Sequence, residues 1–160
     1  MGIEIERRFL VKGNDWRSNI HAKTHIKQGY ILSKSNSWTI RMRIQSDRKS
    51  FITLKHPITK DINHEFEYHI PLVDANSMWE LIDYKVIKTR YYLNQGKEEE
   101  DWIVDCFEGK NNSLIIAEIE LEESTQSITK PDWCGEEITG RYEFSNAALA
   151  KNPILNWPKR

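Results

Sequence analysis

The sequence of 160 residues predicts a mainly β fold of the α+β kind: an eight-stranded antiparallel barrel, closed around a charged interior, with helices packed on the outside. Three observations predict it. Apolar and polar residues alternate with a period of two over most of the chain, which is typical of strands with two different faces. Short turn-forming segments separate these stretches and favour antiparallel pairing of neighbours. The polar face of several strands is almost purely ionic, and an enclosed charged face needs ligands or partners of opposite charge.

The expected strands follow one another along the chain. They are residues 3–11, 25–33, 37–46, 50–56, 63–70, 86–94, 101–108 and 114–123. The segments between them are rich in turn-forming residues, at 33–36, 46–49, 56–63, 94–97 and 109–112, and one short helical turn is expected at 15–20. About eight strands can close into a barrel wide enough to hold one small ligand.

Two helices are expected in the minority helical part of the chain. Asp74 or Asn76 is a candidate N-cap for a helix that runs through Ile82, because a short polar side chain there can accept a backbone N–H. Ser145 is a candidate N-cap for a second helix, which ends before Pro153.

Composition limits the class of protein. A hydrophobic fraction of 39% suits one folded domain over residues 1–160, and no repeat or linker divides the chain. A net charge of −1 gives no basic field for nucleic acid or a membrane surface. Cys106 and Cys134 are isolated, and no apolar run approaches the ~20 residues of a membrane-spanning helix, so we expect a cytoplasmic protein. An uncovered outer barrel face favours a homodimer.

The ionic faces mostly carry charges of one sign within a strand. In the first strand Glu4, Glu6 and Arg8 share one face, and Arg7 interrupts the apolar residues of the other. The remaining charged positions are Arg41 and Arg43; Glu65 and Glu67; Lys88 and Arg90; Glu118, Glu120 and Glu122; Lys55 and Asp105; and Lys27, in a less regular strand. Neighbours on one strand face are roughly 7 Å apart, so like charges repel unless something bridges them.

The two kinds of charge indicate one kind of ligand. Carboxylates without histidine or cysteine spacing match a hard cation, Mg²⁺ or Mn²⁺. Clustered lysine and arginine match phosphate. Together they predict a site for a metal–polyphosphate complex, in which hydrolysis needs only a positioned water activated by a metal or a carboxylate.

Particular segments resemble a known family. Glu4-x-Glu6-x-Arg8 resembles the ExExK signature of the CYTH family, the triphosphate tunnel metalloenzymes. The resemblance continues in order through "KQGYI", "RMR", "TLK", "EFEY", "KTRY", "AEIELE" and "EEITG...FSNAALAKNP". The chain looks like the short, single-domain bacterial form of the family and is similar to its inorganic triphosphatases. The resemblance implies an eight-stranded tunnel, a divalent metal and a triphosphate substrate.

The resemblance also implies roles for single residues. Metal ligands are expected at Glu4, Glu6, Glu118 and Glu120, and a phosphate clamp at Arg8, Lys27, Arg41, Arg43, Lys55, Lys88 and Arg90. Catalytic roles are expected for Tyr30 in proton transfer, for Glu65 and Glu67 in holding metal or orienting water, and for Arg8; Asp105 and Glu122 are expected to support the site. Arg8 stands where the signature has lysine. Arginine keeps the positive charge of lysine, but its guanidinium group is planar and presents several donors. Such a group suits two roles: it can orient the substrate or the water, or it can bind phosphate.

Three functions remain open on the sequence. The first is metal-dependent hydrolysis of inorganic triphosphate to pyrophosphate and phosphate. The second is a class IV-type adenylate cyclase, or a nucleoside or thiamine triphosphatase, using the same tunnel. The third is a polyphosphate-binding module without catalysis, against which the many carboxylates argue.

Overall fold

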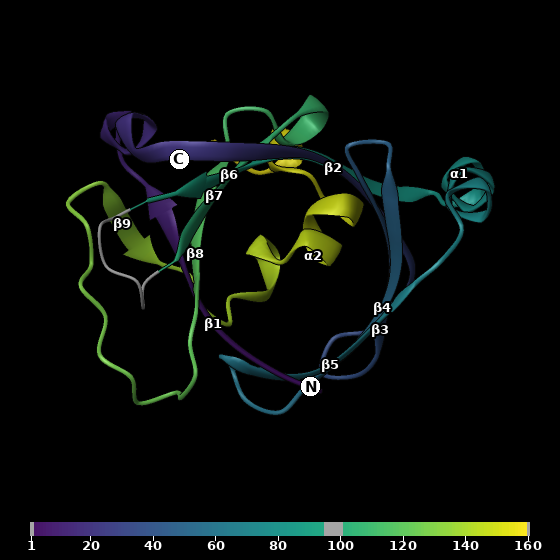
Figure 1. The fold of residues 1–160 in the computed structure, drawn as a ribbon, viewed down its shortest axis with the longest axis horizontal. Helices are drawn as coiled ribbons and strands as arrows, with labels where there is room; N and C mark the ends of the chain where they lie inside the picture. Colours follow the sequence, from purple (N-terminus) through teal and green to yellow (C-terminus); the bar gives the residue numbers. More distant parts are fainter. Residues whose placement is uncertain (1, 95–100, 160) are drawn as a thin grey trace.

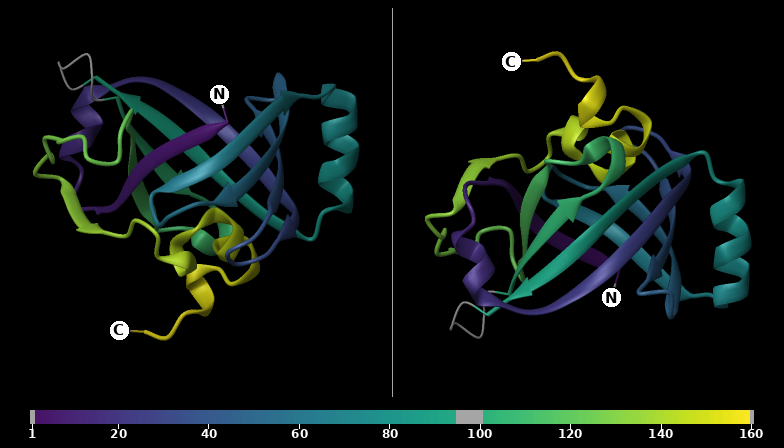
Figure 2. Two further views of the ribbon diagram at one scale, coloured as in Figure 1. Left: turned by 90° about the horizontal axis from the view of Figure 1, so that it is seen from below. Right: turned by 90° about the horizontal axis from the view of Figure 1, so that it is seen from above.

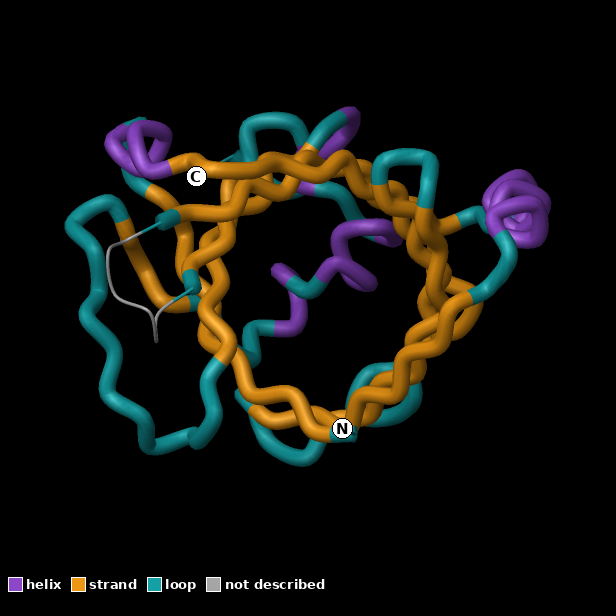
Figure 3. Tube along the Cα trace, viewed as in Figure 1, coloured by secondary structure: helices purple, strands orange, loops and turns teal. Residues whose placement is uncertain are grey.

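Eight antiparallel strands close into a barrel, as predicted. The computed structural model describes residues 2–94 and 101–159. The barrel strands are β1 (Ile3–Val11), β2 (Ile20–Ser33), β3 (Thr39–Gln45), β4 (Lys49–Pro57), β5 (Ile62–His69), β6 (Tyr84–Leu93), β7 (Trp102–Phe107) and β8 (Ile115–Glu120). Around the barrel the order is β5-β4-β3-β2-β6-β7-β8-β1, and β1 pairs again with β5 to close it. Figures 1 and 3 look down the resulting ring of strands.

The first strand closes the barrel by pairing on both sides. Its residues 3–5 pair with β5, and its residues 6–10 pair with β8. At the change of partner, the backbone N–H of Glu6 donates to the carbonyl of Asp61, 3.0 Å away. The two strand edges are therefore joined at the point where the acidic residues of β1 enter the interior.

A ninth strand was not predicted. β9 (Cys134–Glu137) pairs with the end of β1 on the outside of the closed ring. It explains why Arg7 interrupts the apolar face of β1: the Arg7 guanidinium donates to both carboxylate oxygens of Glu137, at 2.9 and 2.8 Å. The sequence Cys-Gly-Glu-Glu has no apolar alternation, so it carries no strand signal.

The outer face of the barrel is apolar where other elements cover it. The helix α1 (Leu72–Leu81) packs over Met42 and Ile44, while the short 3-10 helix η1 (Asp15–Asn19) contributes Trp16 to a second outer cluster. The predicted caps of α1, Asp74 and Asn76, were wrong because both lie inside the helix. Pro71 precedes the helix instead, and proline suits this position because the first N–H groups of a helix have no partner within it.

The helix α2 (Asn146–Lys151) lies at one end of the barrel and not on its outside (Figure 2). Its predicted cap is confirmed: the Ser145 hydroxyl accepts the N–H of Ala148 at 3.2 Å. Leu149 is completely buried in a cluster with Val86 and Ile116, which face inward at this end. The expected charged interior is thus apolar at the end that α2 covers, and α2 closes that end.

Several boundaries differ from the expected ones. β2 begins at Ile20, five residues early, and β8 ends at Glu120, so Glu122 lies beyond the strand. Most of the turn predicted at 94–97 falls outside the described residues. Three further 3-10 helices are η2 (Gly109–Asn111), η3 (Tyr142–Phe144) and η4 (Ile154–Asn156). In the described part of the chain, no helix is both long and apolar enough to cross a membrane.

Candidate active site inside the barrel

Two cavities open into the barrel. One, of about 620 Å³, lies beside α2 and is lined by Arg8, Tyr30, Arg41 and Lys55 among others. The other, of about 1060 Å³, is lined by acidic residues and by the segment that follows β8. Glu6 lines both cavities, so the charged residues between them are reached from two sides.

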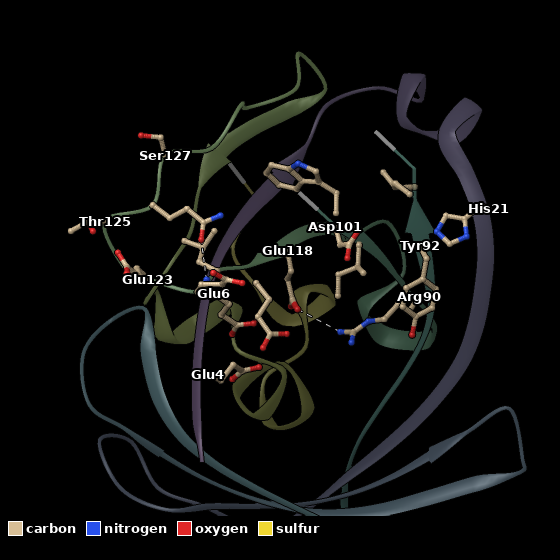
Figure 4. A pocket seen from close by; sticks show the side chains of 17 residues that line it. Glu4, Glu6, His21, Arg90, Tyr92, Asp101, Glu118, Glu123, Thr125 and Ser127 are labelled. Atoms are coloured by element: carbon tan, nitrogen blue, oxygen red, sulfur yellow. Dashed lines mark hydrogen bonds and ion pairs between the residues drawn. The ribbon is translucent and has the colours of Figure 1, made fainter. Parts of the chain in front are cut away.

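Acidic side chains of β1 and β8 converge in the larger cavity. Figure 4 shows Glu4, Glu6 and Glu118 pointing toward one another. Burial raises the pKa of Glu6 to about 7, and the carboxylates of Glu118 and Glu4 contribute to that rise. Burial, with Glu4 and Glu65, also raises the pKa of Glu120, which is exposed at the rim. The cluster is therefore short of positive charge.

Cations from neighbouring strands bind part of this acidic cluster. Arg8 donates from Nε to Glu118 at 3.0 Å. Arg90 lies 3.5 Å from the other oxygen of the same carboxylate, as the dashed line in Figure 4 marks. The ammonium of Lys55 lies 2.6 Å from Glu4 and 3.4 Å from Glu65. Burial opposes the charge on Lys55, but the nearby carboxylates outweigh it and hold its pKa above the ordinary range.

Asp105 holds two basic residues of β6, Lys88 and Arg90, of which Arg90 lines the larger cavity. Its carboxylate accepts hydrogen bonds from Nε and one terminal nitrogen of Arg90, at 2.8 and 2.9 Å, and from the ammonium of Lys88, at 2.7 Å. Lys88 also donates to Asn146 of α2 at 3.0 Å. Lys88 and Asp105 are completely buried. Burial raises the pKa of Asp105, but Arg90 and Lys88 outweigh it and hold that pKa far below its usual range; burial lowers the pKa of Lys88 to about 7. Lys88 holds α2 through Asn146 and lines neither cavity, so the structure does not place it with the expected phosphate clamp.

A second polar group lies on β3, β4 and β5. Arg41 donates to the Thr53 hydroxyl at 3.0 Å, which in turn donates to Glu67 at 2.8 Å. The Nε of Arg41 and one terminal nitrogen of Arg8 are buried, and the described residues offer neither of them a hydrogen-bond partner. Both arginines line the smaller cavity, so that cavity has donors ready for an anion.

Lys27 is a predicted clamp residue that the structure places outside the barrel. Its ammonium lies 4.9 Å from the ring centre of Trp79 on α1, and its cross-strand neighbour Ile44 belongs to the outer core. Side chains alternate along a strand, so Lys27 and Tyr30, three residues apart, take opposite faces. The prediction that Lys27 binds phosphate was wrong for this reason.

Some interior residues had not been predicted. Gln28 is completely buried and bonds both Arg43 and Tyr30, at 2.9 Å each. Thr53 joins Arg41 to Glu67, and the Phe144 carbonyl accepts from Arg8 at 2.9 Å. Gln28 is two residues from Tyr30, and Thr53 is two residues from Lys55. Alternation along a strand places each pair on the same face, so the sequence could have indicated both residues. Glu122 is exposed beyond β8, at the rim of the larger cavity.

The donor set fits a hard divalent cation, although it forms no closed cage. Among residues 2–94 and 101–159 no three acidic, histidine or cysteine side chains are placed to hold one ion. Mg²⁺ usually keeps several waters and takes one or two carboxylates plus substrate phosphates, so it needs no such cage. Burial raises the pKa of Glu6, and the carboxylates of Glu118 and Glu4 raise it further; a divalent cation bound among these groups would offset both effects.

Comparison with known proteins adds the family. A protein from Acetivibrio thermocellus named inorganic triphosphatase is 36% identical over 98% of this chain and 99% of its own length. One of the same name from Nitrosomonas europaea is 29% identical over 92% of this chain and 96% of its own. The crystal structure of an inorganic triphosphatase, 30% identical, superposes with a TM-score of 0.67 over 98% of this chain and 97% of that chain.

A more distant structure shares the fold alone. The protein from Pyrococcus horikoshii is 21% identical, with a TM-score of 0.57 over 81% of this chain and 80% of that chain. The model of the CYTH domain matches residues 2–150, which include every strand of the barrel and the acidic and basic residues inside it. This chain is therefore a member of the CYTH family.

Proposed function

We propose that this chain is a single-domain inorganic triphosphatase that hydrolyses tripolyphosphate to pyrophosphate and phosphate with Mg²⁺ or Mn²⁺. The observation that carries the proposal is the juxtaposition, inside one barrel, of repelling carboxylates and buried arginine nitrogens without partners among the described residues. The names of the similar proteins support it, since two of them are inorganic triphosphatases related over nearly their whole length.

The basic residues of the smaller cavity bind the phosphates. Arg8 and Arg41 each present a buried nitrogen that a phosphate oxygen would satisfy, and Lys55 lines the same cavity. Arg90 of β6 lines the larger cavity and Arg43 of β3 lines neither cavity, and both add positive charge to the interior. Asp105 and Lys88 position Arg90 and α2 from behind.

The acidic residues hold the metal and the water. Glu4, Glu6, Glu118 and Glu120 would hold the ion, which supplies charge neutralisation and an activated water when bound. The pKa of Glu6 is about 7, so near neutral pH this side chain can lose its proton and bind the ion as a carboxylate. Glu65, held by Lys55, and Glu67, held by Thr53, are placed to orient the attacking water.

The experiment is phosphate release from tripolyphosphate, ATP, thiamine triphosphate and pyrophosphate, each with Mg²⁺, Mn²⁺ or EDTA. We expect fast release from tripolyphosphate that EDTA stops. Cyclic AMP formed from ATP would make the chain a cyclase. Metal-dependent binding without release from any substrate would make it a polyphosphate-binding module and overturn the proposal.

Variants of the acidic cluster test the assignment of the metal ligands. Glu4→Gln and Glu118→Gln each remove one carboxylate with little change in shape. We expect both to abolish turnover while circular dichroism shows an intact barrel. Wild-type activity in both would remove these residues from the metal site.

We also propose a cytoplasmic homodimer. Cys106 and Cys134 are both free thiols, as a reducing compartment favours. Ile3, Phe66 and Tyr68 are exposed on the outer face of the barrel, and a second copy would cover them. Sedimentation in dilute buffer tests the dimer, and a Tyr68→Lys variant should weaken it.

A further inference from the structure

Three side chains on β2 and β3 are joined by hydrogen bonds in the barrel interior. Arg43 donates from Nε to the side-chain oxygen of Gln28 at 2.9 Å. The Gln28 amide nitrogen donates to the hydroxyl of Tyr30 at 2.9 Å. Gln28 lies directly opposite Arg43 in the sheet, and Tyr30 is two residues further along the same face. Gln28 lines neither cavity, whereas Tyr30 lines the smaller one.

The direction of these bonds is fixed by chemistry. A guanidinium has only donors, so the oxygen of the Gln28 amide must face Arg43 and its NH₂ group must face Tyr30. The hydroxyl oxygen of Tyr30 accepts that bond, and its own proton must therefore point in another direction. The smaller cavity, which Tyr30 lines together with Arg8, Arg41 and Lys55, is the open direction.

A carboxylate at position 28 would serve Arg43 better. Arg43 is nearly buried, and among the ion pairs of the described residues none joins it to a carboxylate. Burial lowers the pKa of Arg43 to about 9, and its neighbours Arg41 and Arg90 contribute to that fall. Arg90, by contrast, forms an ion pair with the carboxylate of Asp105. A neutral amide leaves the charge of Arg43 uncompensated and provides a donor to Tyr30, which a carboxylate cannot.

We propose that Gln28 is a positioning residue, which turns the hydroxyl proton of Tyr30 into the substrate cavity and leaves the charge of Arg43 available to phosphate. This inference rests on the proposed function and deepens it. With a triphosphate bound, Tyr30 donates a hydrogen bond to an oxygen of the phosphate chain. Arg41 and Arg43 of β3, Lys55 of β4 and Arg8 of β1 are the charged groups that act on Tyr30.

The test is Gln28→Glu, which keeps the shape but replaces the donor with an acceptor. The substituted carboxylate would still accept from Arg43, but Tyr30 would now donate to that carboxylate and withdraw its proton from the cavity. We expect kcat to fall roughly 100-fold or more, the scale of one positioned proton-transfer group. KM should rise as well, because the new carboxylate neutralises Arg43.

The same substitution in a Tyr30→Phe variant separates a positioning role of Gln28 from a general disturbance of the site. In Tyr30→Phe there is no hydroxyl to orient, so Gln28→Glu should cause no further loss of kcat and should still raise KM. If the two losses of kcat multiply, Gln28 does not act through Tyr30 and the proposal is wrong. A fully active Tyr30→Phe variant would overturn it too.

A readout without substrate keeps the test independent of the proposed function. In protein containing tyrosine labelled with carbon-13 at Cζ, the Tyr30 signal is identified by its loss in Tyr30→Phe. We expect Gln28→Glu to move that signal, because the Tyr30 oxygen changes from acceptor to donor. The matched control is Ser50→Ala, which removes the hydrogen bond from another buried side chain to the Ile70 carbonyl, outside both cavities, and should move neither the signal nor kcat.

Failure of the proposed triphosphatase function can be distinguished from failure of the positioning role of Gln28. No phosphate release by the wild-type protein would end the proposed function, while the Tyr30 signal would still report whether Gln28 orients the hydroxyl. An unmoved signal in Gln28→Glu would overturn the positioning role even in an active triphosphatase.

Discussion

At the scale of single residues, Lys27 and Arg41 carry the same charge but lie on opposite sides of the barrel wall. Lys27→Met loses only the contact with Trp79, so we expect kcat/KM for tripolyphosphate to stay within about twofold of wild type. Arg41→Met removes a donor from the smaller cavity and should lower kcat/KM by at least about tenfold. Steady-state kinetics of the pair check this, and equal losses in both variants would contradict the placement of Lys27.

Arg8 makes its hydrogen bonds from two separate nitrogens of the guanidinium, whereas a lysine has a single nitrogen. Arg8 binds Glu118 through Nε and the Phe144 carbonyl through a terminal nitrogen, both within the buried interior. Arg8→Lys keeps the charge but loses one of these hydrogen bonds, and we expect the free energy of unfolding to fall by about 1–3 kcal/mol. Urea unfolding measures it. An unchanged midpoint would mean that the link between β1 and the segment before α2 contributes nothing.

The residues of the site could be predicted where alternation was regular. Glu4, Glu6 and Arg8 share the inner face as expected, as do Arg41 and Arg43. In "KQGYI" Lys27 and Tyr30 lie on opposite faces because side chains alternate along the strand, so the charge of Lys27 does not indicate its face. The partners of each charge were beyond prediction, because they come from strands far apart in sequence, as Arg8 and Glu118 do, 110 residues apart.

At the scale of elements, α2 depends on its cap. Ser145→Ala removes the acceptor for the Ala148 N–H and should lower the free energy of unfolding by about 0.5–2 kcal/mol. Ser77→Ala in α1 is the matched control: its hydroxyl bonds back to the Val73 carbonyl, and its loss should change stability little. Chemical denaturation compares the two, and equal effects would contradict a special role for the cap.

The attachment of β9 depends on pH. The hydrogen bond from Arg7 holds the pKa of Glu137 below its ordinary 4.5. The pair therefore contributes stability that is present above pH 4.5 and is lost as the pH falls through the lower, folded-state pKa. Both side chains are about a third exposed, so the contribution is about 0.5–1 kcal/mol. Thermal unfolding between about pH 6 and pH 3 measures it, with Glu137→Gln as the control that should lack this part of the pH dependence.

The elements differ in how far the sequence could reveal them. The barrel strands follow from alternation, and the Ser145 cap from its side chain. β9 lacks alternation and is held by backbone pairing with β1, by burial of Cys134 in the outer cluster and by the ion pair of Arg7 with Glu137. The place of α2 follows from Val86 and Ile116, apolar residues on an otherwise charged face, whose meaning depends on which end of the barrel they occupy.

At the scale of the whole molecule, the metal should stabilise the fold. A ligand that binds only the folded state at roughly 100 times its Kd adds about 2.7 kcal/mol. We therefore expect Mg²⁺ or Mn²⁺ to raise Tm and EDTA to reverse the rise. Glu6→Gln relieves the repulsion among the carboxylates, so it should raise Tm in EDTA and reduce the response to metal. A metal response equal to that of wild type would place the ion elsewhere.

The closure of the barrel by β1 has a consequence for how the chain is made. β1 is synthesised before its partners in β8, which follow more than a hundred residues later. At about 5–20 residues per second this is a delay of roughly 5–20 s. During that time Glu6, which lies opposite Glu120, has no partner on β8, and the edge of β1 that later pairs with β8 is open to other chains. This acidic strand is thus made long before β8 pairs with it, so the site inside the barrel forms only when the barrel is complete.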